Sequence, residues 1–523
     1  MNDFPWLVVA GLVPLAGTAA IALLPKGREG LSRWVALAAS LITLGVIIAM
    51  ATQFDVATAG EFQFVTSYDW IPAFGVSFKL GVDGIGLVMV ALAACIVPFV
   101  TLASWHDSNP GGTSSVKTFF GLILVLQSMV IWVFSSLDVF LFYVLFEAML
   151  IPAYFLIGRF GGPQRSYAAM KFLLYSLFGG LVMLVSLIGL YIASQDLLGS
   201  GTFDFATLSS LDINPGLQNW LFLGFFLAFA IKAPLWPLHT WLPDAASQAT
   251  PGTAVLLVSL MDKVGTFGMI RYCLRLFPDA SKQFAFAIAV LAVISIVYGA
   301  LLAIGQTDIM RLIAYTSVSH FGFIILGIFV FTPTAQTGAV FYMVAHGLST
   351  AALFLVAGFM VSRGHSRNVA DYGGVFKVAP LLAGTFLLAG LSGLALPGLA
   401  SFPGEFLVLV GSYQRYSALA VIATIAIVLS AVYILWLYQR VATGEPRGVV
   451  IGRFRELGRR EAFAIAPLLA MTIALGVYPQ LLTRVIEPAV VTTIERVGAS
   501  QPAPTQVDSK LLDTSATGEG TAP

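Results

Sequence analysis

The sequence predicts an all-α polytopic membrane protein with about fourteen transmembrane helices. Of its 523 residues, 58% are hydrophobic and 10% are charged, and the mean hydropathy is +0.90. A soluble protein of this length carries roughly a quarter charged residues. The apolar residues fall in runs of about 20, which is the length of a membrane-spanning helix, rather than in the ten-residue alternation of an outer-membrane barrel.

Fourteen apolar runs are expected to cross the membrane. Their approximate limits are 5–24, 32–51, 83–104, 116–134, 139–158, 170–193, 219–242, 252–276, 284–304, 310–331, 336–361, 379–411, 417–438 and 462–482. The first run is expected to be a retained span, because the opening residues MNDF lack the basic stretch of a cleaved signal.

Basic residues are unevenly divided between the loops on the two sides of these spans. Of the 27 Lys and Arg residues, 17 fall on one side and 8 on the other, and Lys232 and Lys263 lie inside spans. Cytoplasmic loops are the richer in Lys and Arg. Both termini are therefore predicted on the non-cytoplasmic side of a bacterial-type inner membrane.

Two spans, the seventh and the twelfth, are predicted to break within the membrane. Lys232 is followed at once by Pro234 and Pro237, and a second interruption runs from Pro397 to Glu405. Proline donates no amide hydrogen bond, so nearby carbonyls lose their helical partners. Because a charge at membrane depth is costly, each break with its ionisable residue indicates an ion-handling site rather than a scaffold.

A spacing of 173 positions relates polar residues of two halves of the chain. The pairs are Asp138 and Arg311, Glu147 and His320, and Lys232 and Glu405. Five predicted helices separate the partners of each pair, so the second copy must be inverted, as in many ion-coupled transporters. The predicted regions are 1–110 (three helices), 111–280 (first five-helix repeat), 281–440 (second, inverted repeat), 441–498 (cytoplasmic loop and last helix) and 499–523 (disordered tail).

Six ionisable side chains lie within the predicted spans and are the candidate proton carriers. They are Glu147, Lys232, Lys263, His320, His346 and Glu405. A glutamate near a buried lysine stabilises the ammonium form, and its removal favours release of a proton. Imidazole exchanges protons near neutral pH, which suits a relay.

Structural alternatives exist for these residues. Glu147 could be a neutral, hydrogen-bonded carboxyl group, whereas Lys232 lies too deep to reach either membrane surface. Lys263 could belong to a local network with the adjacent Asp262 and with Ser259 one turn back. Either histidine could be an interhelical hydrogen bonder, or the two could ligate a haem. Two further carboxylates are expected at helix ends or in loops, namely Asp138 and Asp244.

Five segments, which occur in order between roughly residues 80 and 440, resemble the antiporter-like subunits of respiratory complex I. They are 146–152 (FEAMLIP), 232–245 (KAPLWPLHTWLPDA), 308–320 (DIMRLIAYTSVSH), 345–349 (AHGLS) and 397–405 (PGLASFPGE). The resemblance implies a fourteen-helix fold with helices 4–8 and 9–13 as the inverted repeats. It also implies that Glu147 and Lys232 form a charge pair. By the same resemblance, Lys263 is the central lysine of the proton pathway, and Glu405 is the terminal ionisable residue of its second half.

By the resemblance, four features distinguish this chain from some relatives of the family, and the last two are departures from the common pattern. Related L- and N-type subunits carry lysine where this chain has Glu405, and the L type has a long C-terminal lateral helix for which this chain lacks the length. Ala246 replaces a histidine and Met310 replaces a lysine that many relatives carry, which puts the proton uptake route in question.

By this resemblance, the chain is expected to be a proton-translocating subunit of the membrane arm of NADH:quinone oxidoreductase, driven by quinone reduction elsewhere. Its expected partners are other membrane-arm subunits, with L- and N-type chains on either flank. FMN, iron–sulfur clusters and quinone are expected on partner subunits, and no metal or cofactor is expected here. No CxxC motif occurs, and no GxGxxG motif follows a strand.

Three other functions stay open at this point. The chain could belong to a multisubunit sodium/proton antiporter or a membrane-bound hydrogenase. It could also be a structural spacer that conducts nothing, or a free-standing solute transporter.

Overall fold

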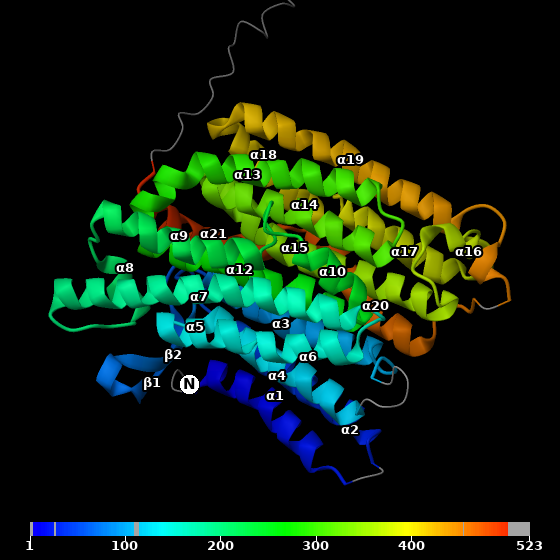
Figure 1. Ribbon diagram of the computed structural model, residues 1–523, viewed down its shortest axis with the longest axis horizontal. Helices are drawn as coiled ribbons and strands as arrows, with labels where there is room; N and C mark the ends of the chain where they lie inside the picture. Colours follow the sequence, from blue (N-terminus) through cyan, green and yellow to red (C-terminus); the bar gives the residue numbers. More distant parts are fainter. Residues whose placement is uncertain (1–3, 26–27, 109–114, 453, 500–523) are drawn as a thin grey trace, which may run out of the picture.

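The computed structural model describes residues 4–25, 28–108, 115–452 and 454–499, and their secondary structure is almost entirely helical (Figure 1). The first helices are α1 (Trp6–Leu23), α2 (Leu31–Ala51), α3 (Gly84–Ala103), α4 (Val116–Ser135), α5 (Val139–Ala148), α6 (Leu150–Phe160), α7 (Arg165–Leu198), α8 (Phe205–Ser210), α9 (Pro215–Lys232) and α10 (Trp241–Gln248). One continuous helix then comprises α11 (Pro251–Val255), η2 (Leu256–Met261), α12 (Asp262–Gly268) and η3 (Met269–Leu274).

The second half of the chain continues with helices of similar length. They are α13 (Pro278–Ile304), α14 (Ile309–Phe329), α15 (Pro333–Gly364), α16 (Val375–Val378), α17 (Pro380–Gly393), α18 (Ser401–Arg415), α19 (Ser417–Ala442), α20 (Arg459–Val477) and α21 (Gln480–Val497). Short 3-10 turns are η1 (Pro72–Phe74), η4 (Val369–Asp371) and η5 (Gly448–Val450). Strands β1 (Gln63–Ile71) and β2 (Val76–Val82) form an antiparallel hairpin.

The membrane class predicted from composition is confirmed. Among the described residues, 12 helices are long and apolar enough to cross a membrane, with α5–α6 and α11–η3 each taken as one helix. The two other predicted spans are the interrupted segments α9–α10 and α17–α18. Exposed side chains on α7 and α19 are largely apolar, which is expected of surfaces that face lipid or a partner subunit.

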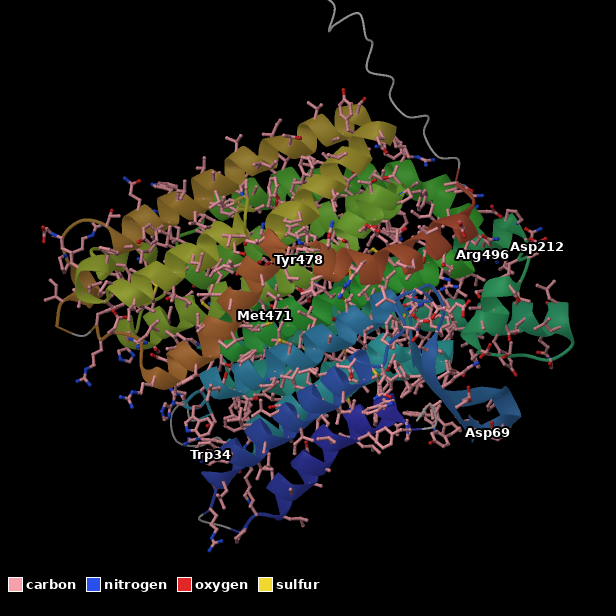
Figure 2. The ribbon with its side chains drawn as sticks, turned by 180° about the vertical axis from the view of Figure 1, so that it is seen from behind. Trp34, Asp69, Asp212, Met471, Tyr478 and Arg496 are labelled. Atoms are coloured by element: carbon pink, nitrogen blue, oxygen red, sulfur yellow. The ribbon has the colours of Figure 1, made fainter. Side chains whose placement is uncertain are left out.

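The long helices run alongside one another across the view of Figure 1, with their connections at the two ends of the bundle. The hairpin and α8 lie at one end, and α16 lies at the other. Near the end of the described chain, Arg496 lies at the same end as Asp69 of the hairpin and Asp212 of the loop before α9 (Figure 2). Helix α1 starts at this end too (Figure 1), so the first and last long helices of the described chain have their outer ends at the same end of the bundle.

Burial is highest in the helices at the centre of the bundle. In α11–η3 every residue of the most apolar stretch is buried, and in α14 and α15 94% of residues in that stretch are buried. The corresponding share is 33% in α1, α2 and α19, so these helices lie at the periphery. Three of the six candidate proton carriers lie in these central helices, namely Lys263, His320 and His346.

Both predicted helix breaks are present. Helix α9 ends at Lys232, and the carbonyl of Ile231, which the break frees, accepts a hydrogen bond from Trp241 Nε1 at 2.8 Å. Helix α17 ends at Gly393, and α18 starts at Ser401, which puts Glu405 in its second turn.

Two aspartates that begin long helices have the same local structure. Asp138 caps α5 and Asp308 caps α14, each by accepting a backbone hydrogen bond from the third residue on. The residues that flank Asp138 exchange two backbone hydrogen bonds with the residues that flank Asp204, which is also a cap residue. The residues that flank Asp308 do the same with those that flank Asn368, another cap residue. This match supports an internal repeat, with Asp138 equivalent to Asp308 rather than to Arg311.

Several elements were not predicted, namely the β1–β2 hairpin, α8, α16, α21 and the 3-10 turns, and some span limits differ by about five residues, as at the starts of α7 and α13. The β1–β2 hairpin lies between apolar runs whose signal dominates this part of the sequence, and α21 follows the last predicted span. That span was expected to continue to residue 482, but α20 ends at Val477 because Tyr478 precedes Pro479 and is driven out of helical geometry. Beyond residue 499, the predicted disordered tail lies outside the described residues.

One carboxylate joins three helices from both halves of the chain. Asp244, in the first turn of α10, accepts from Lys171 of α7 and from Arg311 of α14, each at 2.7 Å. This is the helix-end position expected for it, because carboxylates are favoured near helix N-termini.

We expect the Asp244→Asn substitution to destabilise the subunit by about 1–2 kcal/mol, because it removes both charge-assisted contacts from a partly buried site. Thermal unfolding of the assembled complex in detergent measures this effect. The matched control is Glu445→Gln, which removes a contact to Lys377 between side chains 83% and 52% exposed. Equal melting curves for the two variants would contradict the expected role of Asp244.

Candidate proton-transfer site

Lys232 ends its helix in an aromatic environment with no hydrogen-bonding partner. Its side chain is 1% exposed, and Nζ lies 5.0 Å from the ring centroid of Phe146 and 5.6 Å from that of Phe172. Among the described residues none accepts a hydrogen bond from this Nζ. The rings of α5 and α7 therefore supply cation–π stabilisation, which partly offsets the cost of burying the ammonium group.

Glu147 lies close enough to attract Lys232 but not close enough to pair with it. The two side chains interact electrostatically, although no nitrogen–oxygen distance between them falls within 4.0 Å. Glu147 Oε1 is buried and has no hydrogen-bond partner in the described part of the chain. This carboxylate occupies the space beside Gly180 of α7, where an added Cβ would lie 1.7 Å from Oε1. A fully hydrogen-bonded, purely structural Glu147 does not fit this arrangement.

Lys263 connects the first half of the site to α15. Its Nζ donates to the carbonyl of Val258 at 2.8 Å and lies 2.8 Å from His346 Nδ1. The helix is π-helical both before and after α12, a distortion that often accompanies functional sites. The expected alternative, a hydrogen-bonded network with Asp262 and Ser259, is not formed, because neither of those side chains has a partner among the described residues.

The two histidines are in contact with each other. The ring centroids of His346 and His320 are 5.2 Å apart in an edge-to-face arrangement, and His320 Nε2 lies 3.3 Å from the hydroxyl of Tyr433. Two axial haem ligands must stand on opposite faces of the haem. Rings packed directly against each other leave no room for that plane, so joint haem ligation does not fit.

Glu405 completes the site at the second broken helix. It is buried, and its Oε1 accepts a hydrogen bond from the hydroxyl of Tyr342, whose ring centroid lies 5.8 Å from that of His320. Gly404 makes this approach possible, because a Cβ at that position would lie 2.7 Å from Tyr342 Cβ.

All six predicted side chains therefore come together in one series. Its order is Glu147, Lys232, Asp262, Lys263, His346, His320, Tyr342 and Glu405, with Tyr433 beside His320. The series starts at α5, passes the break after α9 and the π-helical segment, and ends at α18 beyond the second break. It provides a row of proton donors and acceptors through both halves of the chain.

Three members of this series were not among the predicted site residues. Asp262 carries a sequence signal, because it is a carboxylate inside an apolar run, but it was treated only as a possible structural partner of Lys263. Tyr342 and Tyr433 carry no such signal, since tyrosine is common in membrane helices. Ala246 and Met310, where the resemblance implied histidine and lysine in many relatives, are both buried.

Comparison with known proteins gives consistent matches. The family described as NADH:quinone oxidoreductase/Mrp antiporter, transmembrane, matches residues 136–430. NADH-quinone oxidoreductase subunit M of Mycobacterium tuberculosis (strain ATCC 25618 / H37Rv) is 52% identical over 96% of each chain. A chain of respiratory complex I from Thermus thermophilus superposes with a TM-score of 0.84 at 30% identity, covering 94% of this chain and 100% of that one. A chain of the Mrp complex from Dietzia sp. DQ12-45-1b has a TM-score of 0.81 at 21% identity, over 94% and 99% of the two chains, which shows a common fold.

We expect Gly265→Val to separate α12 from the break that follows Lys232. A Cβ at this glycine would lie 2.6 Å from the Ala233 amide nitrogen and 2.7 Å from the Phe229 carbonyl oxygen, so the helices cannot keep their spacing. Overpacking of this kind costs about 1–3 kcal/mol. The variant should melt at a lower temperature and translocate protons poorly. Gly384→Val is the control, because a Cβ there would meet no atom within 4 Å, and similar losses in both variants would argue against a special role for Gly265.

Proposed function

This chain belongs to the family of NADH:quinone oxidoreductase and Mrp antiporter membrane subunits, and we propose that its buried series of acids and bases carries protons across the membrane. The chain is a polytopic, antiporter-like, proton-translocating subunit of the membrane arm of an NADH–quinone oxidoreductase, and its partners are other membrane-arm subunits. The residues that carry the protons, the order of the steps and the neighbours on each flank are parts of the proposal.

The observation that carries the proposal is the burial of ionisable groups one after another from α5 past both broken helices to α18. Buried charges in a bilayer are costly, and natural proteins retain them chiefly along ion and proton pathways. Eight side chains lie in one row, and most of them have a donor or acceptor atom without a partner among the described residues. Packing alone explains such a row poorly.

The first half of the pathway works through the Glu147 and Lys232 charges. When the carboxylate is ionised, it stabilises the lysine ammonium; when it takes up a proton or moves away, the ammonium more readily gives up its own proton. Moving one proton against 100 mV requires about 2.3 kcal/mol, which is within the range of one such charge interaction at short distance in a protein.

The second half of the pathway combines two hydrogen-bonding contacts, at Lys263 and at Glu405, with packing between aromatic rings. A proton on Lys263 Nζ can pass to His346 Nδ1 along the 2.8 Å contact, because a neutral imidazole accepts at one nitrogen and donates at the other. The His346 ring packs against the His320 ring, and His320 packs against Tyr342, whose hydroxyl donates to Glu405. We propose that the proton passes along this order of side chains. Glu405 serves as the terminal acceptor in this half of the chain.

The energy source lies elsewhere in the complex. We propose that FMN, iron–sulfur clusters and quinone are held by partner subunits, and that quinone reduction drives shifts in the charge state of this series. L- and N-type chains are the proposed neighbours on the two flanks, and both termini are proposed on the non-cytoplasmic side, from the distribution of basic residues. An assignment to an Mrp-type antiporter rests on common fold at 21% identity, whereas the relation to subunit M rests on 52% identity.

We expect Lys232→Ala to lower the number of protons translocated per electron while the complex still assembles, because the first half of the pathway loses its central base. Proteoliposomes containing the whole complex, energised with NADH and quinone, give this ratio from the pH change and the NADH consumed. Lys377→Ala is the control, since that lysine is exposed and outside the series. An unchanged ratio in Lys232→Ala would identify the chain as a non-conducting spacer.

A further inference from the structure

Asp262 is a carboxylate in an unusual position. It is 0% exposed, it starts α12 directly after the π-helical segment, and neither of its oxygens accepts a hydrogen bond from any described residue. Burying a polar group without partners is unfavourable, and an ionised one is more so. A structural role would normally supply hydrogen-bond donors to such a group, and here none is supplied.

The charges nearest to Asp262 are those of two lysines from different helices. Its carboxylate attracts both Lys263, its neighbour in α12, and Lys232, at the end of α9. Gly265 holds α12 against the break after Lys232, with no space for a side chain between the two backbones. Asp262 lies three residues before Gly265, and so on the same face of α12, which brings its side chain to the side of the helix that faces the break.

Asp262 and Lys263 point in different directions because they are consecutive residues of a helix. Successive side chains diverge by about 100° around the axis. The Lys263 side chain is directed to Val258 and to His346 of α15. The adjacent carboxylate is therefore turned away from that contact, and its electrostatic partner outside its own helix is Lys232.

The four ionisable groups of the first half alternate in charge along the series. Glu147, Lys232, Asp262 and Lys263 have formal charges of minus, plus, minus and plus. Without Asp262, two ammonium groups would be neighbours in the series and would repel each other. With it, a carboxylate stands between the two lysines, where it can take a proton from an ammonium and pass it to a neutral amine.

We propose that Asp262 is the relay that carries a proton from Lys232 to Lys263. In the first step, through one intervening water, an N–H bond of the Lys232 ammonium breaks, its electron pair stays on nitrogen, and an O–H bond forms on the Asp262 carboxylate. In the second step that O–H bond breaks, and an N–H bond forms on the neutral amine of Lys263. Lys232 ends neutral, Lys263 ends cationic, and Asp262 returns to the carboxylate.

This relay rests on the proposed function and makes it more specific. It identifies the group that links Lys232, at the end of the first broken helix, to Lys263 and so to the histidines of the second half. The distance between the two lysines then need not be crossed in a single transfer.

The test is Asp262→Asn in the whole complex, because asparagine keeps the size of the side chain and cannot carry the proton. We expect normal assembly, a melting temperature close to that of the unmodified complex, and a ratio of protons to electrons as low as that of Lys232→Ala. Asp212→Asn, in an exposed loop, is the matched control and should retain the full ratio. An infrared difference spectrum during turnover should also lose one carboxylic-acid band in Asp262→Asn.

The outcomes separate this inference from the proposed function. If Lys232→Ala lowers the ratio and Asp262→Asn does not, the relay is overturned and the pathway stands. If neither substitution lowers it, the proposed function is overturned as well. A lower melting temperature with an unchanged ratio would assign Asp262 a structural role.

A second measurement covers the case in which Asp262→Asn does not assemble. A map of the unmodified complex that resolves internal water should show a hydrogen-bonded path from Lys232 Nζ through the Asp262 carboxylate to Lys263 Nζ. Dry packing between Asp262 and either lysine would overturn the relay.

Discussion

A lysine ammonium group at the end of a helix, deep inside a membrane protein, constrains everything around it. Lys232 ends α9 with no hydrogen-bond acceptor among the described residues, so its charge is stabilised only by two aromatic rings and by carboxylates at a distance. Such a charge is sensitive to small changes in its neighbours, because the surroundings screen it weakly. A proton carrier needs this sensitivity, and a structural ion pair does not.

The continuity of the series depends on glycines that allow close approach between helices. Gly180 leaves room for the Glu147 carboxylate, Gly265 brings α12 against the break after α9, and Gly404 lets α18 reach Tyr342. In each case an added Cβ would lie less than 3 Å from the functional group or from the backbone that positions it. Small residues at helix contacts are common in membranes because they permit such packing, and here they also set the spacing of the proton carriers.

The two halves of the chain are joined both at the series and away from it. At the membrane-embedded site, the contact between Lys263 and His346 crosses from the first half to the second. Nearer the end of the bundle, Asp244 holds α7 and α14 together through α10. The two halves are therefore in direct contact both within the series and outside it.

The sequence by itself determined the membrane class, both helix breaks and six of the side chains in the series, because apolar length, proline and buried charge are local signals. Only the tertiary structure decided that these six are neighbours, since residues as far apart as Glu147 and Glu405 are brought together by packing between helices. It also decided the parts played by Asp262, Tyr342 and Tyr433. The sequence alone assigns none of these three residues a part in the series. Their roles follow from the groups that surround them and, for Asp262, from the lack of hydrogen-bond partners among the described residues.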